Sequence, residues 1–169
     1  YQTPITANAA LGGSLKGIIQ RLPYIADLGV DVIYLTPIFY SNSSHKYDTI
    51  DYYKIDPTFG TTDDLVMLVD KAHTLGLRVI LDGVFNHTSP EFFAFRDVVE
   101  KGENSRYKDW YYIHEFPVRT TPMQHNYKCF SYFWGMPKVN LRCAAAADYF
   151  TEVALYWLRI AKVDGWRLD

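Results

Sequence analysis

Two helix-like segments, each closed by a glycine, lead into short and densely apolar runs. In the first unit, apolar residues recur at helical spacing across 14–28, and Gly29 follows them. Because proline is favoured in the first turn of a helix, we expect the regular helix to begin at Pro23. The next run, 30–36 (VDVIYLT), is nearly all apolar and is followed by Pro37. This pattern predicts a strand that is buried on both faces.

The second unit carries clearer signals at both ends. Thr61 and Asp64 have the spacing of a capping box, and Gly76 has the position of a C-terminal cap. Five apolar residues between them predict one helical face: Leu65, Leu68, Val69, Ala72 and Leu75. The run 77–85 (LRVILDGVF) predicts a second buried strand.

The third unit follows a long break in this pattern. Apolar residues recur at helical spacing from Phe150 to Ala161, and the strand-like run 163–169 comes after them. Strands that alternate with helices indicate parallel βαβ units. The intervening residues, 88–140, are rich in aromatic, histidine and turn residues. They are too many for a connecting loop, so we expect a small inserted subdomain on top of the sheet.

Composition narrows the classes of partner. Hydrophobic residues make up 49% of the chain, which is enough for a substantial core. The formal net charge is −2 and the basic residues form no block, so neither nucleic acid nor an anionic membrane surface is an expected partner. No apolar run approaches the length of a membrane span. Residues 1–13 lack the features of a signal peptide, which favours a cytoplasmic location. Aromatic residues reach 17%, which fits either a large aromatic core or contacts with sugar rings.

Polar side chains gather where the predicted strands end, which is where parallel α/β barrels carry their chemistry. The first strand leads to a segment with four candidates: His45, Tyr47, Asp48 and Asp51. Asp82 lies within the second strand, which ends in Asn86 and His87. Arg167 and Asp169 lie in the third strand and point to the same face, because side chains alternate along a strand.

These residues allow more than one interpretation. An aspartate beside a guanidinium stays ionised, so Asp169 next to Arg167 suits nucleophilic attack on a sugar. The same two residues also fit a purely structural ion pair, and Asp82 fits a buried partner for Arg167. A single histidine such as His87 is more often structural than functional. A zinc site from Asp82, Asn86 and His87 is conceivable, but a second cluster with ligand spacing is missing.

Several stretches resemble one family of enzymes. DGVFNH (82–87) and GWRLD (165–169) resemble the first and second signature regions of the α-amylase family of glycoside hydrolases. Further stretches are similar to its neopullulanase, cyclomaltodextrinase and maltogenic amylase group: GGSLKGI (12–18), LTPIF (35–39), HKYDTIDYYKIDPTFG (45–60), EFFAFRDVVEKGENSRYKDWYYI (91–113) and MPKVN (136–140). The resemblance covers nearly the whole chain in order.

The resemblance implies an α/β fold, a partial (β/α)8 TIM barrel with about the first four strands and an inserted domain B after the third. The implied divisions are 1–87 for the first part of the barrel, 88–140 for domain B, and 141–169 for a barrel helix and the fourth strand. The implied reaction is hydrolysis, with retention, of α-1,4-glucosidic bonds in cyclodextrins, pullulan or maltooligosaccharides. An α-glucan oligosaccharide is therefore the expected partner.

The resemblance also implies roles for individual residues. Asp169 is the expected nucleophile, and Arg167 is expected to hold its carboxylate and to contact substrate. Tyr47 is expected to stack under the sugar ring, and His87 is expected to hydrogen bond to it. The other implied roles are support of the active site by Asp82 and Asn86 and a substrate contact by Phe130.

The sequence also departs from the family pattern. The family needs a glutamic acid on the fifth strand as general acid/base, and these residues do not supply it. We therefore expect a chain truncated at its nucleophile and inactive alone. The stretch 3–10 (TPITANAA) replaces a calcium-binding loop, with Tyr1 and Gln2 as a remnant of the first strand. Ser14 stands where the group has an aspartate ligand. No metal or other cofactor is therefore predicted.

Two rival interpretations remain open at this point. The chain could be a non-catalytic carbohydrate-binding half-barrel, or a truncated product without a function. The domain that mediates dimer formation in this group has no match here, so homodimers are expected only of full-length relatives.

Overall fold

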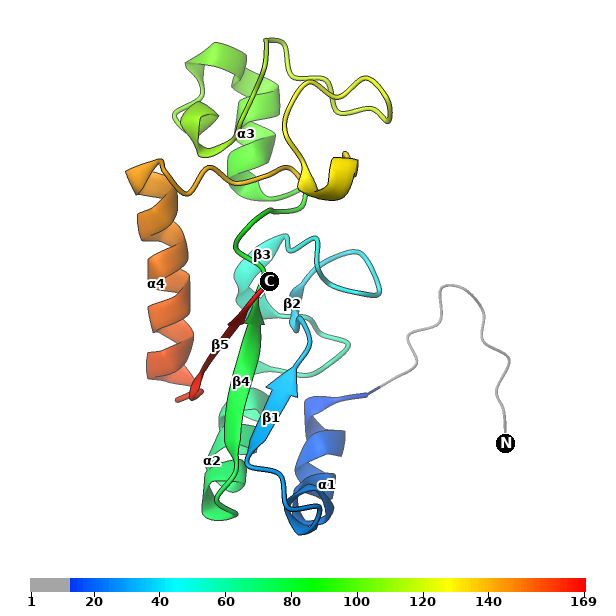
Figure 1. The fold of residues 1–169 in the computed structure, drawn as a ribbon, viewed down its shortest axis with the longest axis vertical. Helices are drawn as coiled ribbons and strands as arrows, with labels where there is room; N and C mark the ends of the chain where they lie inside the picture. Colours follow the sequence, from blue (N-terminus) through cyan, green and yellow to red (C-terminus); the bar gives the residue numbers. More distant parts are fainter. Residues whose placement is uncertain (1–12) are drawn as a thin grey trace, which may run out of the picture.

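The computed structural model describes residues 13–169 of the chain (Figure 1). The expectations for Tyr1, Gln2 and the stretch 3–10 therefore lie outside the described residues. The helices are α1 (Leu15–Asp27), α2 (Thr62–Thr74), α3 (Phe93–Lys101) and α4 (Ala144–Ile160). The strands are β1 (Val32–Leu35), β2 (Phe39–Tyr40), β3 (Asp51–Ile55), β4 (Arg78–Gly83) and β5 (Gly165–Leu168).

Three parallel strands form the central sheet, in the order β1-β4-β5. α2 connects β1 to β4 and α4 precedes β5, so the predicted alternation of strands and helices is confirmed. Strands β2 and β3 form a separate antiparallel hairpin between β1 and α2. In the parallel sheet, Ile80 of β4 lies opposite both Tyr34 of β1 and Gly165 of β5. This register determines which side chains meet at the upper ends of the strands.

The helices cover one face of the sheet and leave the other face open. Leu35, Val79 and Leu81 are buried in a core that also contains residues of α1, α2 and α4. On the opposite face Val32 and Tyr34 are 43% and 41% exposed. The prediction that the first strand is buried on both faces is therefore wrong, because within residues 13–169 no element packs over that face. Coverage on one face is typical of a barrel segment and not of a doubly wound sheet.

Helix α1 begins earlier than the sequence pattern predicted. It starts at Leu15, and Pro23 lies inside it, so the prediction that the regular helix begins at Pro23 is wrong. Ser14 is the N-cap, and its hydroxyl accepts a hydrogen bond from the backbone N–H of Gly17 at 3.1 Å. Leu15, at the start of α1, and Leu22, just before Pro23, are both buried, and their burial stabilises the helix. This cap and this packing outweigh the one backbone hydrogen bond that Pro23 removes.

Replacement of Ser14 by alanine should lower the free energy of unfolding by about 1 kcal/mol, because the N–H of Gly17 loses its acceptor. Chemical denaturation of the variant beside the parent protein measures this difference. Ser44→Ala is the matched control, since Ser44 is exposed and caps no helix. Equal stability of the Ser14 variant and the parent would contradict the cap assignment.

The other two predicted helices are present, and the second has the predicted end signals. The capping box of α2 is present, with reciprocal hydrogen bonds between Thr61 and Asp64, and Gly76 follows the helix with a φ of +74°. Four of the five predicted apolar positions of α2 are buried, and Leu75 is 42% exposed at the C-cap. Helix α4 buries Phe150, Val153 and Trp157 as its spacing predicted.

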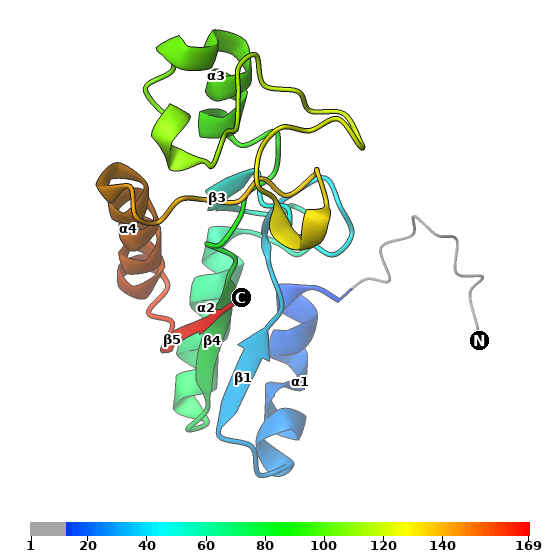
Figure 2. The same ribbon diagram turned by 45° about the horizontal axis from the view of Figure 1, so that its top comes forward.

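Residues 88–140 lie above the upper ends of the sheet strands (Figures 1 and 2). This segment contains α3 and three short 3₁₀ helices: η1 (Gly102–Asn104), η2 (Lys108–Trp110) and η3 (Phe130–Tyr132). Isolated bridges pair its two halves, Tyr111 with Val139 and Ile113 with Tyr127. Its end returns to the sheet, where the N–H of Val139 donates to the carbonyl of Asn86 at 2.9 Å. Among residues 13–169, no helix is long and apolar enough to cross a membrane.

Candidate active site

The upper end of the parallel sheet brings three charged side chains together. Asp82 of β4 lies opposite Arg167 of β5 in the register. The Nη1 of Arg167 is 3.3 Å from both carboxylate oxygens of Asp82. The same nitrogen donates to Oδ1 of Asp169. Figure 1 shows the C-terminal residue beside the upper end of β4. Arg167 therefore bridges two carboxylates, and the interpretation of Asp82 as a buried partner of Arg167 is confirmed.

Asp82 is held in place by two tyrosines as well as by Arg167. Its side chain is fully buried. The hydroxyl of Tyr34 donates to Oδ2 of Asp82, and the hydroxyl of Tyr47 lies 3.3 Å from the same oxygen. Although the ring of Tyr34 is partly exposed, its hydroxyl loses solvation where it meets the buried Asp82 carboxylate. This desolvation and the hydrogen bond to Asp82 raise the pKa of Tyr34 well above its usual value, so the hydroxyl remains a donor at neutral pH. Sequence analysis missed Tyr34, because its place inside an apolar run gave no sign of a polar partner.

Arg167 provides a permanent positive charge next to Asp169. The hydrogen bond to Asp169 is the main reason why the pKa of Arg167 lies above its usual value, and Asp82 adds to this shift. The side chain of Asp169 is only 15% exposed. The hydrogen bond from Arg167 keeps this carboxylate in a fixed direction, which is what a nucleophile requires.

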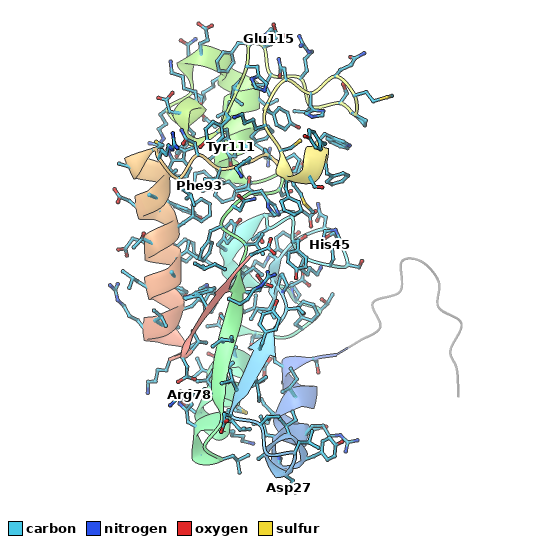
Figure 3. All side chains as sticks on the ribbon, viewed as in Figure 1. Asp27, His45, Arg78, Phe93, Tyr111 and Glu115 are labelled. Atoms are coloured by element: carbon cyan, nitrogen blue, oxygen red, sulfur yellow. The ribbon has the colours of Figure 1, made fainter. Side chains whose placement is uncertain are left out.

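Tyr47 and His45 lie on the loop that joins β2 to β3, and a buried ion pair holds this loop. Lys46 is 7% exposed, and its Nζ lies 2.7 Å from Oδ2 of Asp56. The same nitrogen donates to the carbonyl oxygen of Ser41 at 2.9 Å. A buried lysine needs such partners, because an unpaired charge costs several kcal/mol. These contacts tie the middle of the loop to its first residue, Ser41, and to Asp56 just after β3, so the rings beside Lys46 project in defined directions. Figure 3 labels His45 on this loop.

Asn86 and His87 follow β4, and their backbone is tied to the core. The hydroxyl of Tyr52 donates to the carbonyl oxygens of Val84 and His87, at 2.7 and 2.9 Å. Oδ1 of Asn86 accepts a hydrogen bond from Nζ of Lys138 at 3.0 Å. Asn86 therefore connects the end of β4 to the end of the 88–140 segment. The anchor Tyr52 was not found from the sequence, since its partners lie more than 30 residues away.

The ring of His87 is buried, and both of its nitrogens have neighbours. Nε2 lies 3.0 Å from the carbonyl oxygen of Tyr47, so this nitrogen carries the proton. Nδ1 lies 3.3 Å from the amide nitrogen of Asn86. Burial lowers the pKa of His87, although Asp169, the hydrogen bond to Tyr47 and Asp48 act in the opposite direction. The ring is therefore neutral at pH 7.

A pH dependence of stability follows from this lowered pKa. Below about pH 6.5 the unfolded chain binds a proton at His87 that the folded protein resists, so the free energy of unfolding should fall between pH 7 and pH 5. Denaturation of the parent and of His87→Gln at both pH values measures the effect. The variant should lose less stability than the parent as the pH falls. An equal loss in both proteins would contradict a lowered pKa.

These side chains border a cavity of about 350 Å³, the active-site cavity. Its lining residues are His45, Tyr47, His87, Phe130, Met136 and Asp169. Phe130 faces the ring of His87 at a centroid distance of 4.9 Å. The predicted residues Tyr47, His87 and Asp169 thus meet in one cavity, with Arg167 and Asp82 behind Asp169. Met136 was not predicted here, because an isolated methionine carries no sign of function.

The residues of this site do not favour a metal ion. Within 13–169, no three His, Cys, Asp or Glu side chains are arranged to hold one. Asp82, Asn86 and His87, the conceivable zinc ligands, are engaged with Arg167, Lys138 and Tyr47 instead. Ser14, the residue expected at a calcium-ligand position from the resemblance, uses its hydroxyl as a helix cap.

Comparison with protein families matches residues 5–169 to the α-amylase catalytic domain. The chain belongs to this family. Its sheet is accordingly part of a TIM barrel. A cyclomaltodextrinase of Geobacillus thermopakistaniensis is 51% identical over 164 residues, which are 97% of this chain and 28% of that protein. Neopullulanase 2 of Thermoactinomyces vulgaris is 52% identical over 94% of this chain and 27% of its own length.

Solved structures of this family agree with the computed fold. The type III pullulan hydrolase from Thermococcus kodakarensis superimposes with a TM-score of 0.89 and is 41% identical. The superposition covers 99% of this chain and 30% of the hydrolase. The chain therefore spans less than a third of the length of these α-amylase family relatives.

Proposed function

We propose that the protein that carries this chain hydrolyses α-1,4-glucosidic bonds in cyclodextrins, pullulan or maltooligosaccharides, with retention of configuration. One observation carries the proposal: the Asp169 carboxylate borders the active-site cavity and is held by Arg167, which Asp82 holds in turn. The names of the relatives, cyclomaltodextrinase and neopullulanase, supply the substrate class.

In this mechanism Asp169 attacks the anomeric carbon of the bound sugar, and the glycosidic C–O bond breaks as a general acid gives a proton to the departing oxygen. Water then hydrolyses the covalent glycosyl intermediate and frees Asp169. Arg167 directs the attacking carboxylate through its hydrogen bond to Asp169. The ring of Tyr47 stacks under the sugar, since aromatic faces pack well against the C–H faces of sugars. His87 borders the cavity beside the sugar, while its two ring nitrogens face the carbonyl oxygen of Tyr47 and the amide of Asn86. Asp82 acts through Arg167 and does not touch the substrate.

A retaining glycosidase needs two carboxyl groups about 5–5.5 Å apart. Asp169 is the sole acidic residue among the described residues that line the active-site cavity. The chain covers 27–28% of the lengths of the cyclomaltodextrinase and the neopullulanase. We therefore propose that the general acid/base belongs to the remainder of the barrel and that the isolated 169-residue chain is inactive.

The test compares the purified 169-residue chain with the complete protein on cyclodextrin and on pullulan. The complete protein should release reducing sugar, and the isolated chain should release none above a buffer control. Turnover by the isolated chain, after removal of contaminating enzyme, would overturn the proposal about the second carboxyl group. Failure of the complete protein on both substrates would overturn the proposed reaction.

We also propose the division of the chain into 1–87, 88–140 and 141–169 as barrel, domain B and barrel. The bridges within 88–140 and its position above the sheet support this division (Figure 2). Replacement of residues 88–140 in the complete protein by a short glycine–serine linker tests it. The barrel should still unfold in one cooperative transition, and loss of that transition would contradict the division.

A further inference from the structure

A second cavity, the outer cavity, has a volume of about 500 Å³ and lies away from Asp169. It is bordered by the β2–β3 hairpin, by the start of α3 and by the first half of α4, with Tyr40, Tyr53, Phe93 and Tyr149 as its aromatic lining. It shares no lining residue with the active-site cavity. Its volume lies in the range of about 300–1,000 Å³ that is typical of small-molecule sites.

The aromatic lining of the outer cavity is accessible and preformed. Along β3, Tyr52 points into the core and its neighbour Tyr53 points outward, with 37% of its surface exposed. Tyr149 packs edge-on against Tyr53 and Phe93, at centroid distances of 6.0 and 5.5 Å. Phe93 is 44% exposed and lies between the start of α3 and the top of α4 (Figure 3). Large rings that are held by one another and remain open to solvent form a rigid apolar surface.

The charged residues around these rings are balanced in sign. Two acidic side chains, Asp51 and Glu91, and two basic ones, Lys54 and Arg96, line the outer cavity. Within 13–169, the side chains of Glu91 and Arg96 form no ion pair and no hydrogen bond. A ligand with many hydroxyl groups can use such donors and acceptors together. A charged ligand would gain from one pair and be repelled by the other, so the lining favours a neutral ligand.

We infer that the outer cavity is a second binding site for an α-glucan chain, separate from the site of hydrolysis. Aromatic rings would pack against the C–H faces of the sugars, and Glu91 and Arg96 would bind their hydroxyl groups. The choice of an α-glucan as the ligand rests on the proposed function. A long glucan that binds here stays close to the protein while another end of the same glucan occupies the active-site cavity.

Affinity electrophoresis of the complete protein in native gels that contain soluble amylopectin tests this site. All proteins carry Asp169→Asn, so that the polymer in the gel is not degraded. Tyr53→Ala should weaken the retardation by about five- to tenfold in apparent dissociation constant, because it removes an exposed ring. Tyr24→Ala is the matched control: Tyr24 is 59% exposed on α1, outside the outer cavity, and its loss should change nothing.

Glu91→Ala is a second, independent variant at an exposed position, and it should also weaken retardation. Thermal melting of each variant identifies one that fails to fold. If folded Tyr53→Ala and Glu91→Ala proteins migrate like the Asp169→Asn parent, the second site is overturned. Hydrolysis of cyclodextrin and of pullulan by the complete protein with Asp169 intact is measured in parallel. If neither substrate is hydrolysed but retardation still depends on Tyr53, the proposed reaction is overturned and the second site is supported.

Discussion

Replacement of Asp169 by asparagine is expected to lower kcat of the complete protein on cyclodextrin by about 10⁴-fold or more. The amide is nearly the same size but cannot form the glycosyl intermediate, because it is neutral and a poor nucleophile. It also loses the charge that faces Arg167. Because Tyr47 and His87 remain in place around the active-site cavity, substrate should still bind.

The measurement is a comparison of kcat and of equilibrium binding of a maltooligosaccharide. Asp148→Asn is the matched control, because Asp148 is exposed on α4 and forms no ion pair among the described residues. The control should retain the kcat of the parent. If Asp169→Asn turns over within tenfold of the parent, another residue is the nucleophile. The Arg167–Asp169 contact is then a structural ion pair, as the sequence alone allowed.

Replacement of Asp82 by asparagine is expected to lower kcat by about 10²-fold, although Asp82 does not touch the substrate. Asp82 is fully buried, and it orients Arg167 through two contacts at 3.3 Å. The amide keeps the shape but removes the charge that attracts Arg167. The guanidinium should then turn toward solvent and leave Asp169 less well directed. Thermal melting should show a lowered Tm for the same reason.

A second readout separates a positioning role from simple loss of stability. In the Asp82→Asn/Asp169→Asn double variant, kcat should be no lower than in Asp169→Asn alone, since Asp82 acts through Asp169. Two effects that multiply would show that Asp82 contributes independently of the nucleophile. Tyr34→Phe should give a smaller loss of kcat, because it removes one hydrogen bond to Asp82 and leaves the charge.

Much of the local structure could be predicted from the sequence. Thr61 and Asp64 lie three residues apart and form the predicted capping box, and Gly76 has the predicted left-handed backbone. The helical spacing that begins at Phe150 correctly indicated a buried face of α4. These features depend on residues within a few positions of one another, so their signals lie in short stretches of sequence.

The same local rules failed where distant residues decide the outcome. Pro23 did not start α1, because Leu15 is buried and its N–H donates to the distant carbonyl of Phe59 at 2.9 Å, which stabilises an earlier beginning. Val32 looked like a buried residue and is 43% exposed, because its face of the sheet has no covering element within the described residues. Apolar character alone does not say which face of a strand is covered.

Some features of the candidate site could also be predicted from the sequence, and others depended on the tertiary structure. The sequence by itself determined the family, through two short motifs that carry Asp82 and His87 on one strand end and Arg167 and Asp169 on another. Only the tertiary structure brought the hydroxyl of Tyr34 to Asp82 across 48 positions and formed the outer cavity between a hairpin and two helices. Motifs are read from neighbours along the chain, whereas a hydrogen bond between remote residues depends on strand register and packing, which emerge when the whole sheet folds.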